Sequence, residues 1–225
     1  MKLTPKLWNW DGACVDRSRL AGVAEGIPLV WQAPLTDDRA VHAHLTSVLS
    51  GTERERMEQF RRSGDQARFL VGRGLLRLLV GAQVNLPPER VAFKLGPFGK
   101  PFMVPPFGKP PLHFNVAHSG QWVLLAFSAT HEVGVDIEEI RPAQDWQEVG
   151  RRIFPAAEYA AWLRLEGAER SPAFFQIWTR HEAGLKALGL GLAGADEGKA
   201  IPNDRLTIFD LDLPAGYRGA VAWVG

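Results

Sequence analysis

The feature that most constrains the fold is an alternation in residues 134–138, which read Gly-Val-Asp-Ile-Glu. Apolar and acidic residues alternate with period two, and this pattern predicts a β-strand. Because successive side chains of a strand point to opposite faces, Asp136 and Glu138 share one face, while Val135 and Ile137 enter the core. The chain must therefore build a sheet with one buried face, whose other face carries two neighbouring carboxylates.

A second segment, residues 178–186, reads Trp-Thr-Arg-His-Glu-Ala-Gly-Leu-Lys and predicts a helix. Glu182 and Lys186 lie one turn apart on its same face. With Asp136 and Glu138 they make three carboxylates and one ammonium, a set that suits a hard cation and phosphate rather than a soft metal. Each pair also has an ordinary reading. The helix pair could be a solvated ion pair, and the strand pair could be the wet face of an edge strand.

The composition is typical of a globular protein without a nucleic-acid or membrane partner. Of the 225 residues, 46% are hydrophobic and 23% are charged, which allows one large domain or two small ones. The net charge of +1 lacks the basic excess of a nucleic-acid binder. No apolar run has the length of a membrane span, the N-terminus lacks a signal core, and the single cysteine, Cys14, fits a reducing compartment. We therefore expect a cytoplasmic protein.

The order of the expected elements predicts an α+β fold in two similar halves. The first part of the chain is expected to contain a strand, then helices, then a strand. The second part is expected to contain strands, then helices, then strands. The first half, residues 1–112, includes a connector rich in Pro and Gly, and the second half, residues 113–225, carries the carboxylates. Helix N-caps are expected at Thr36, Thr52 and Ser171. A cleft between the halves is the expected ligand site.

Four motifs along the chain resemble those of one enzyme family. The connector repeats Pro-Phe-Gly-Lys-Pro at residues 97–101 and 106–110, and Phe-Asn-Val-Ala-His-Ser follows at residues 114–119. Together with the acidic strand and the Glu-Lys helix, these segments resemble the 4′-phosphopantetheinyl transferases, in the broad-specificity branch that includes the surfactin-type enzyme. The motifs occur in the family's order between about residues 49 and 191.

The resemblance implies a pseudo-twofold, monomeric enzyme and a specific reaction. The 4′-phosphopantetheine arm of coenzyme A passes to a serine hydroxyl of an apo acyl or peptidyl carrier protein, and 3′,5′-ADP leaves. Mg²⁺, with Mn²⁺ as the alternative ion, would be bound by Asp136, Glu138 and Glu182. Glu182 has a competing role as general base for the serine, and Lys186 would neutralise phosphate charge.

The resemblance also implies contacts to coenzyme A from Arg56, Lys100, the backbone of Ala117, His118 and Lys186. Each has an ordinary alternative. Lys100 could be an exposed turn lysine with Lys109 taking its place, His118 a structural histidine, and Arg56 a solvated helix arginine.

Two positions depart from the family's pattern. Ala117 stands where the family has serine, and His181 stands where it has lysine. These departures favour a second reading, a relative that binds coenzyme A or a carrier protein without turnover. A third reading is a Mg²⁺-dependent phosphohydrolase that uses the same carboxylates.

Overall fold

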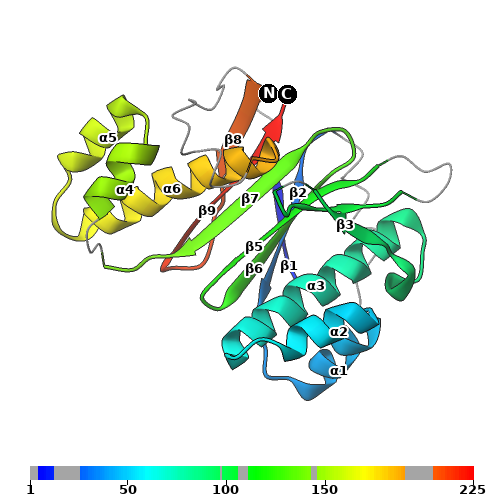
Figure 1. Cartoon of the computed structure of the whole chain (residues 1–225). Helices are drawn as coiled ribbons and strands as arrows, with labels where there is room; N and C mark the ends of the chain where they lie inside the picture. Colours follow the sequence, from blue (N-terminus) through cyan, green and yellow to red (C-terminus); the bar gives the residue numbers. More distant parts are fainter. Residues whose placement is uncertain (1–4, 13–25, 97, 106–110, 143–145, 191–204) are drawn as a thin grey trace.

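The computed structural model describes residues 5–12, 26–96, 98–105, 111–142, 146–190 and 205–225, and it is an α+β structure (Figure 1). The first sheet has the order β1-β2-β6-β5. Its strands are β1 (Lys6–Asn9), β2 (Leu29–Pro34), β5 (His113–Ser119) and β6 (Trp122–Ser128). β1 pairs in parallel with β2, whereas β2, β6 and β5 pair antiparallel.

The second sheet has the order β7-β9-β8 and is antiparallel throughout. Its strands are β7 (Val133–Glu139), β8 (Leu206–Asp210) and β9 (Tyr217–Val224). A separate two-stranded hairpin in the connector consists of β3 (Phe93–Leu95) and β4 (Pro101–Met103).

The helices divide between the two sheets. The first group is α1 (Arg39–Val48), α2 (Gly51–Glu58), α3 (Ser63–Val84) and the 3₁₀ turn η2 (Pro88–Arg90). The second group is α4 (Trp146–Ile153), α5 (Ala156–Leu163), the 3₁₀ turn η3 (Gly167–Glu169) and α6 (Arg170–Ala187). Within the described ranges, no helix is both long and apolar enough to span a bilayer.

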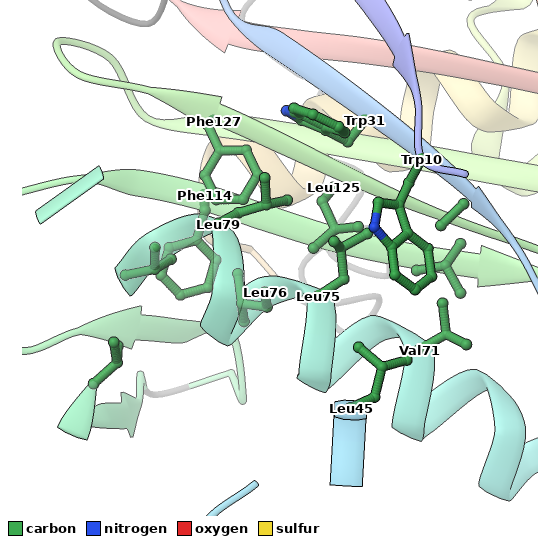
Figure 2. Packing of buried hydrophobic residues seen from close by; sticks show 14 of the residues in the cluster. Trp10, Trp31, Leu45, Val71, Leu75, Leu76, Leu79, Phe114, Leu125 and Phe127 are labelled. Atoms are coloured by element: carbon green, nitrogen blue, oxygen red, sulfur yellow. The ribbon is translucent and has the colours of Figure 1, made fainter. Parts of the chain in front are cut away.

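The sheets face each other, and a long helix covers the outer face of each. Residues of α3 such as Leu75 and Leu79 pack with Trp31 and Phe127 on one face of the first sheet (Figure 2). The opposite face of that sheet packs on the second sheet, through contacts such as those of Leu124 with the cluster that contains Val135 and Val221. Small residues of α6, including Ala183, cover the outer face of the second sheet. The layers are therefore helix, sheet, sheet, helix.

Two helix starts differ from the sequence-based expectation. Asp38, rather than Thr36, caps α1, because its carboxylate accepts from two backbone amides in the first turn. Ser50, rather than Thr52, caps α2, and its hydroxyl forms a capping box with Glu53. In both cases two polar residues lie within two positions of each other, and the cap is the one whose side chain accepts from the amides of the first turn.

The start of α6 also differs, since the expected cap Ser171 lies inside this helix. The 3₁₀ turn η3 runs directly into α6 at Arg170, so the chain needs no separate side-chain cap there.

The boundary expected at residue 112 separates β5 and β6 from β2, the strand with which β6 pairs. A division between β6 and β7, near residue 130, would leave both sheets whole. Each half would then consist of one sheet covered by one long helix.

Candidate active site

The carboxylates of β7 lie beneath α6. Gly134 allows this close packing, because a Cβ at that position would overlap the carbonyl oxygen of Ala183 and the amide of Ala187, both on α6. Val135 faces the opposite way, into the core between the sheets. Asp136, two residues after Gly134, shares the α6 side and is only 5% exposed. It is therefore a buried acid and not part of a wet strand face.

Lys186 joins α6 to β7. Its ammonium donates to Asp136 Oδ1 at 2.6 Å. Glu182, one turn earlier on α6, is only 8% exposed, so the Glu182/Lys186 pair is not a solvated ion pair. The structure thus brings three of the predicted site residues together on facing elements.

The same burial changes the protonation of these acids. The pKa of Asp136 is raised to about 7, chiefly by loss of hydration; the Lys186 ammonium opposes this rise, and the charges of Glu138 and Glu182 add to it. Burial also raises the pKa of Glu182, again with the charge of Glu138 adding to the effect. The mutual repulsion shows that Asp136, Glu138 and Glu182 are electrostatic neighbours. We call these three residues the carboxylate cluster.

The carboxylate cluster has the donor chemistry that a hard cation requires. Asp136 Oδ2 and Glu182 Oε1 are buried and have no hydrogen-bond partner, so each is an acceptor that a cation would satisfy. In the part of the chain that the structure describes, however, no three acidic, His or Cys side chains are already drawn together as a metal-binding group. The Lys186 ammonium contacts Asp136 instead, so ion binding would require this contact to rearrange.

Strand β5 runs beside β7 and is bonded to it by side chains. Asn115 Oδ1 accepts from the backbone amide of Val135 at 2.9 Å. Ser119 Oγ donates to Glu138 Oε2 at 2.8 Å and accepts from the amide of Glu139 at 3.0 Å. Asn115 and Ser119 were not predicted as site residues. The signal was available in their spacing of four, which places both on one face of a strand.

Ala117 lies between Asn115 and Ser119 on that face and is 5% exposed. Its methyl group packs in the core between the sheets, with Val135 and Leu124. The side chain of Ala117 therefore faces away from α3.

The other face of β5 forms a pocket against α3. Val116 and His118 line a cavity of about 180 Å³ together with residues of α2, α3 and β4. Its lining includes the cations Arg56, Arg68 and Arg73, and the imidazole of His118. We call this cavity the cationic pocket. Burial lowers the pKa of His118, and the nearby charges of Arg68 and Lys186 lower it further. His118 lines this pocket, and the next residue, Ser119, bonds to Glu138, so β5 connects the pocket to the carboxylate cluster.

Lys100 does not join the cationic pocket. Its ammonium donates to Glu132 Oε2 at 2.8 Å, to the carbonyl of Val133 at 3.0 Å and to the carbonyl of Lys186 at 2.9 Å. All three donors of the ammonium are thus used within the protein, where they tie the connector to β7 and to the end of α6. Lys109, the alternative, lies outside the described residues.

Lys100 also lines a larger, mostly apolar cavity of about 500 Å³. Phe98, Phe102 and Leu112 contribute its apolar wall, and Pro101 lines both this cavity and the cationic pocket. His181, which replaces the family's lysine, has a buried Nε2 without a hydrogen-bond partner, and burial lowers its pKa. Its ring therefore favours the neutral form.

The chain matches known proteins over both halves. Residues 33–130 match the sequence profile of the N-terminal part of 4′-phosphopantetheinyl transferases, and residues 132–218 match that of the 4′-phosphopantetheinyl transferase superfamily. The chain is 36% identical to slr0495 of Synechocystis sp., which carries the same family name, over 81% of this chain and 72% of that protein.

Two further relatives are the 4′-phosphopantetheinyl transferases HetI of Nostoc sp. and Sfp of Bacillus subtilis, each 33% identical to this chain. The match to HetI covers 75% of this chain and 71% of HetI. The match to Sfp covers 65% of this chain and 63% of Sfp. The chain therefore belongs to the 4′-phosphopantetheinyl transferase superfamily. The transferase class and the α+β fold expected from the motifs are confirmed.

Proposed function

We propose that the protein transfers the 4′-phosphopantetheine arm of coenzyme A to a serine hydroxyl of an apo acyl or peptidyl carrier protein and releases 3′,5′-ADP. The observation that carries this proposal is that two sites of opposite charge lie along β5, where His118 lines the cationic pocket and the next residue, Ser119, bonds to Glu138 of the carboxylate cluster. The carboxylates of Asp136 and Glu182 are buried and partly unpartnered, and the pocket is lined by arginines and His118. Attack on a phosphorus within a diphosphate needs both of these, because its charge must be neutralised and its geometry fixed.

The cationic pocket suits the phosphates of the nucleotide end of coenzyme A. Arg56 and Arg68 supply planar guanidinium groups, which bind phosphate oxygens through two donors at once. His118, on the β5 side, would donate to a phosphate oxygen. Lys186 bonds to Asp136, so its ammonium would turn to the diphosphate when an ion takes its place on the carboxylate.

The apolar cavity beside the cationic pocket suits the adenine ring. The two cavities share Pro101, and the apolar one offers Phe98 and Phe102 as flat surfaces for a base. Lys100 would then act indirectly, because it holds the connector in position against Val133 rather than binding a phosphate itself.

Asp136, Glu138 and Glu182 would hold Mg²⁺ or Mn²⁺. An ion bound there would neutralise the diphosphate and polarise the phosphorus that is attacked. Oxygen ligands and buried, unpartnered acceptors are the features of this cluster that support the assignment.

Glu182 is also the candidate general base, a role that competes with ion binding because a metal-bound carboxylate is a weaker base. Burial raises its pKa, so its carboxylate takes a proton more readily than an exposed glutamate. In the reaction, the serine oxygen bonds to the phosphorus that carries the pantetheine arm and its proton passes to Glu182. The bond from that phosphorus to the bridging oxygen breaks, and 3′,5′-ADP leaves with the electron pair.

The two departures from the family's pattern do not favour the reading without turnover. Ala117 packs in the core, and His181 is half-buried, with no hydrogen-bond partner for its Nε2. Neither change removes a group from the carboxylate cluster. We further propose a monomer that acts in the cytoplasm, since one chain supplies both walls of the site and its single cysteine suits a reducing compartment.

One mass measurement tests the proposed function. The protein is incubated with coenzyme A, Mg²⁺ and an apo carrier protein, and the carrier is weighed by mass spectrometry. A gain equal to one phosphopantetheine arm supports the transferase. Cleavage of coenzyme A without a gain would mean a phosphohydrolase, and binding without either change would mean a protein that binds without turnover.

A further inference from the structure

We infer that Ser119 is a positioning residue that orients Glu138 toward the proposed metal site. The inference rests on the proposed function, because it gives Glu138 a role as ion ligand. Ser119 lies on β5 of the first sheet and Glu138 on β7 of the second, so the contact crosses between the two sheets.

The hydroxyl of Ser119 accepts one hydrogen bond and donates another. Its oxygen accepts the backbone amide of Glu139 at 3.0 Å, so its own proton is free to point to Glu138 Oε2 at 2.8 Å. A hydrogen bond from a hydroxyl to a carboxylate is among the stronger ones in proteins, so it can fix the direction of the Glu138 carboxylate.

Among the described residues, Ser119 and Arg141 contact that carboxylate through their side chains, and Ser119 is the closer of the two. The second is Arg141, which reaches the same Oε2 at 3.4 Å and is itself 60% exposed. The side chain of Glu138 is 25% exposed, so without Ser119 it would turn toward Arg141 and solvent. Ser119 therefore holds Glu138 near Asp136. The charge of Glu138 contributes to the raised pKa of Asp136.

The backbone turn that follows Ser119 is held in place by contacts on both sides. Gly120 has a φ of +52°, and a Cβ there would overlap the hydroxyl of Tyr217 and lie 3.0 Å from Glu139 Cδ. On the other side, Arg68 of the cationic pocket donates to the carbonyl of Gly120 at 3.0 Å. A rigid turn is what a positioning role requires, because a mobile hydroxyl could not fix the direction of a carboxylate.

The test uses Ser119→Ala, which removes the hydroxyl, and Ser119→Thr, which keeps it on a residue that suits a strand. The matched control is Tyr217→Phe. The hydroxyl of Tyr217 bonds to Glu139 and to the amide of Gln121, so its loss weakens the same junction without touching Glu138. Mn²⁺ affinity is measured by electron paramagnetic resonance at saturating 3′,5′-ADP, and coenzyme A affinity is measured in EDTA by calorimetry.

We expect Ser119→Ala to weaken Mn²⁺ binding by about tenfold or more, as is usual for residues that orient metal ligands. Ser119→Thr should restore most of it, Tyr217→Phe should keep wild-type Mn²⁺ affinity, and all three should bind coenzyme A normally in EDTA. Wild-type Mn²⁺ affinity in Ser119→Ala, or an equal loss in Tyr217→Phe, would overturn the positioning role. If the wild-type protein transfers the arm but binds no Mn²⁺, the metal role of Glu138 fails together with this inference. If it binds Mn²⁺ but transfers nothing, only the proposed function fails.

Discussion

Replacing Gly134 with alanine should move α6 away from the acids of β7. The added Cβ would overlap Ala183 O and Ala187 N and would lie 2.9 Å from the carbonyl carbon of Lys186, whereas ordinary contact begins at 3.4 Å. These are backbone atoms, so no side chain can swing aside. The helix must therefore shift on the order of 1 Å, and a shift of that size at a catalytic group typically costs about a hundredfold in rate.

The same change should also cost stability, since forcing an extra methyl group into a packed interior costs about 1–3 kcal/mol. In a protein of this size each kcal/mol lowers the melting temperature by about 2–4 °C. Gly74→Ala is the matched control. Its Cβ would lie 2.9 Å from the side chain of Leu45 on α1, remote from the carboxylates.

Both variants are compared by thermal unfolding and by the rate of carrier modification under saturating substrates. We expect both to melt several degrees lower and only Gly134→Ala to lose kcat by about a hundredfold. A folded Gly134→Ala protein with wild-type kcat would refute the argument that the closeness of α6 and β7 sets the chemistry. So would an equal loss of kcat in Gly74→Ala.

Three further predictions concern charged groups. Asp136→Asn should lower Mg²⁺-dependent transfer by about a hundredfold or more while the protein stays folded by circular dichroism; near-normal turnover at saturating Mg²⁺ would remove Asp136 from the metal site. Arg68→Ala should raise KM for coenzyme A by about tenfold or more, whereas Lys100→Ala should mainly lower the melting temperature, and the reverse pattern would return the phosphate role to Lys100. The contacts from His113 and Lys100 lower the pKa of Glu132 from 4.5 to about 2, so this acid stabilises the fold above pH 4.5 and loses that contribution as the pH falls toward 2. The free energy of unfolding, measured with denaturant between pH 6 and pH 2.5, should therefore fall less steeply for Glu132→Gln than for the wild type. Parallel curves for the two proteins would contradict the assignment.

The local parts of the site could be predicted from the sequence. The period of two in residues 134–138 correctly separates the core residue Val135 from the acid Asp136. The period of the helix also places Glu182 and Lys186 on one side of α6. Both predictions depend only on residues close together in the chain, where strand and helix geometry is fixed.

The contacts between distant segments could not be predicted. Lys186 bonds to Asp136 across 50 residues, and Lys100 bonds to the carbonyl of Lys186 across 86. From the sequence alone, Lys100 reads as an exposed turn lysine, because nothing near it in the chain shows that the end of α6 lies beside it. The partners of Ser119 likewise depend on which strands become neighbours. The same holds for any division of the chain that would leave both sheets whole.

Strand β5 serves both sites, and this limits how the protein can change. Its odd positions, Asn115 and Ser119, bond to β7, while its even positions, Val116 and His118, line the cationic pocket. Inserting or deleting one residue within β5 would exchange the two sets, so both sites would fail at once. The spacing between the proposed phosphate and metal positions is thus set by the thickness of a single strand. A variant meant to accept a different donor nucleotide should therefore be altered at the pocket-lining positions of α3 and should leave β5 unchanged.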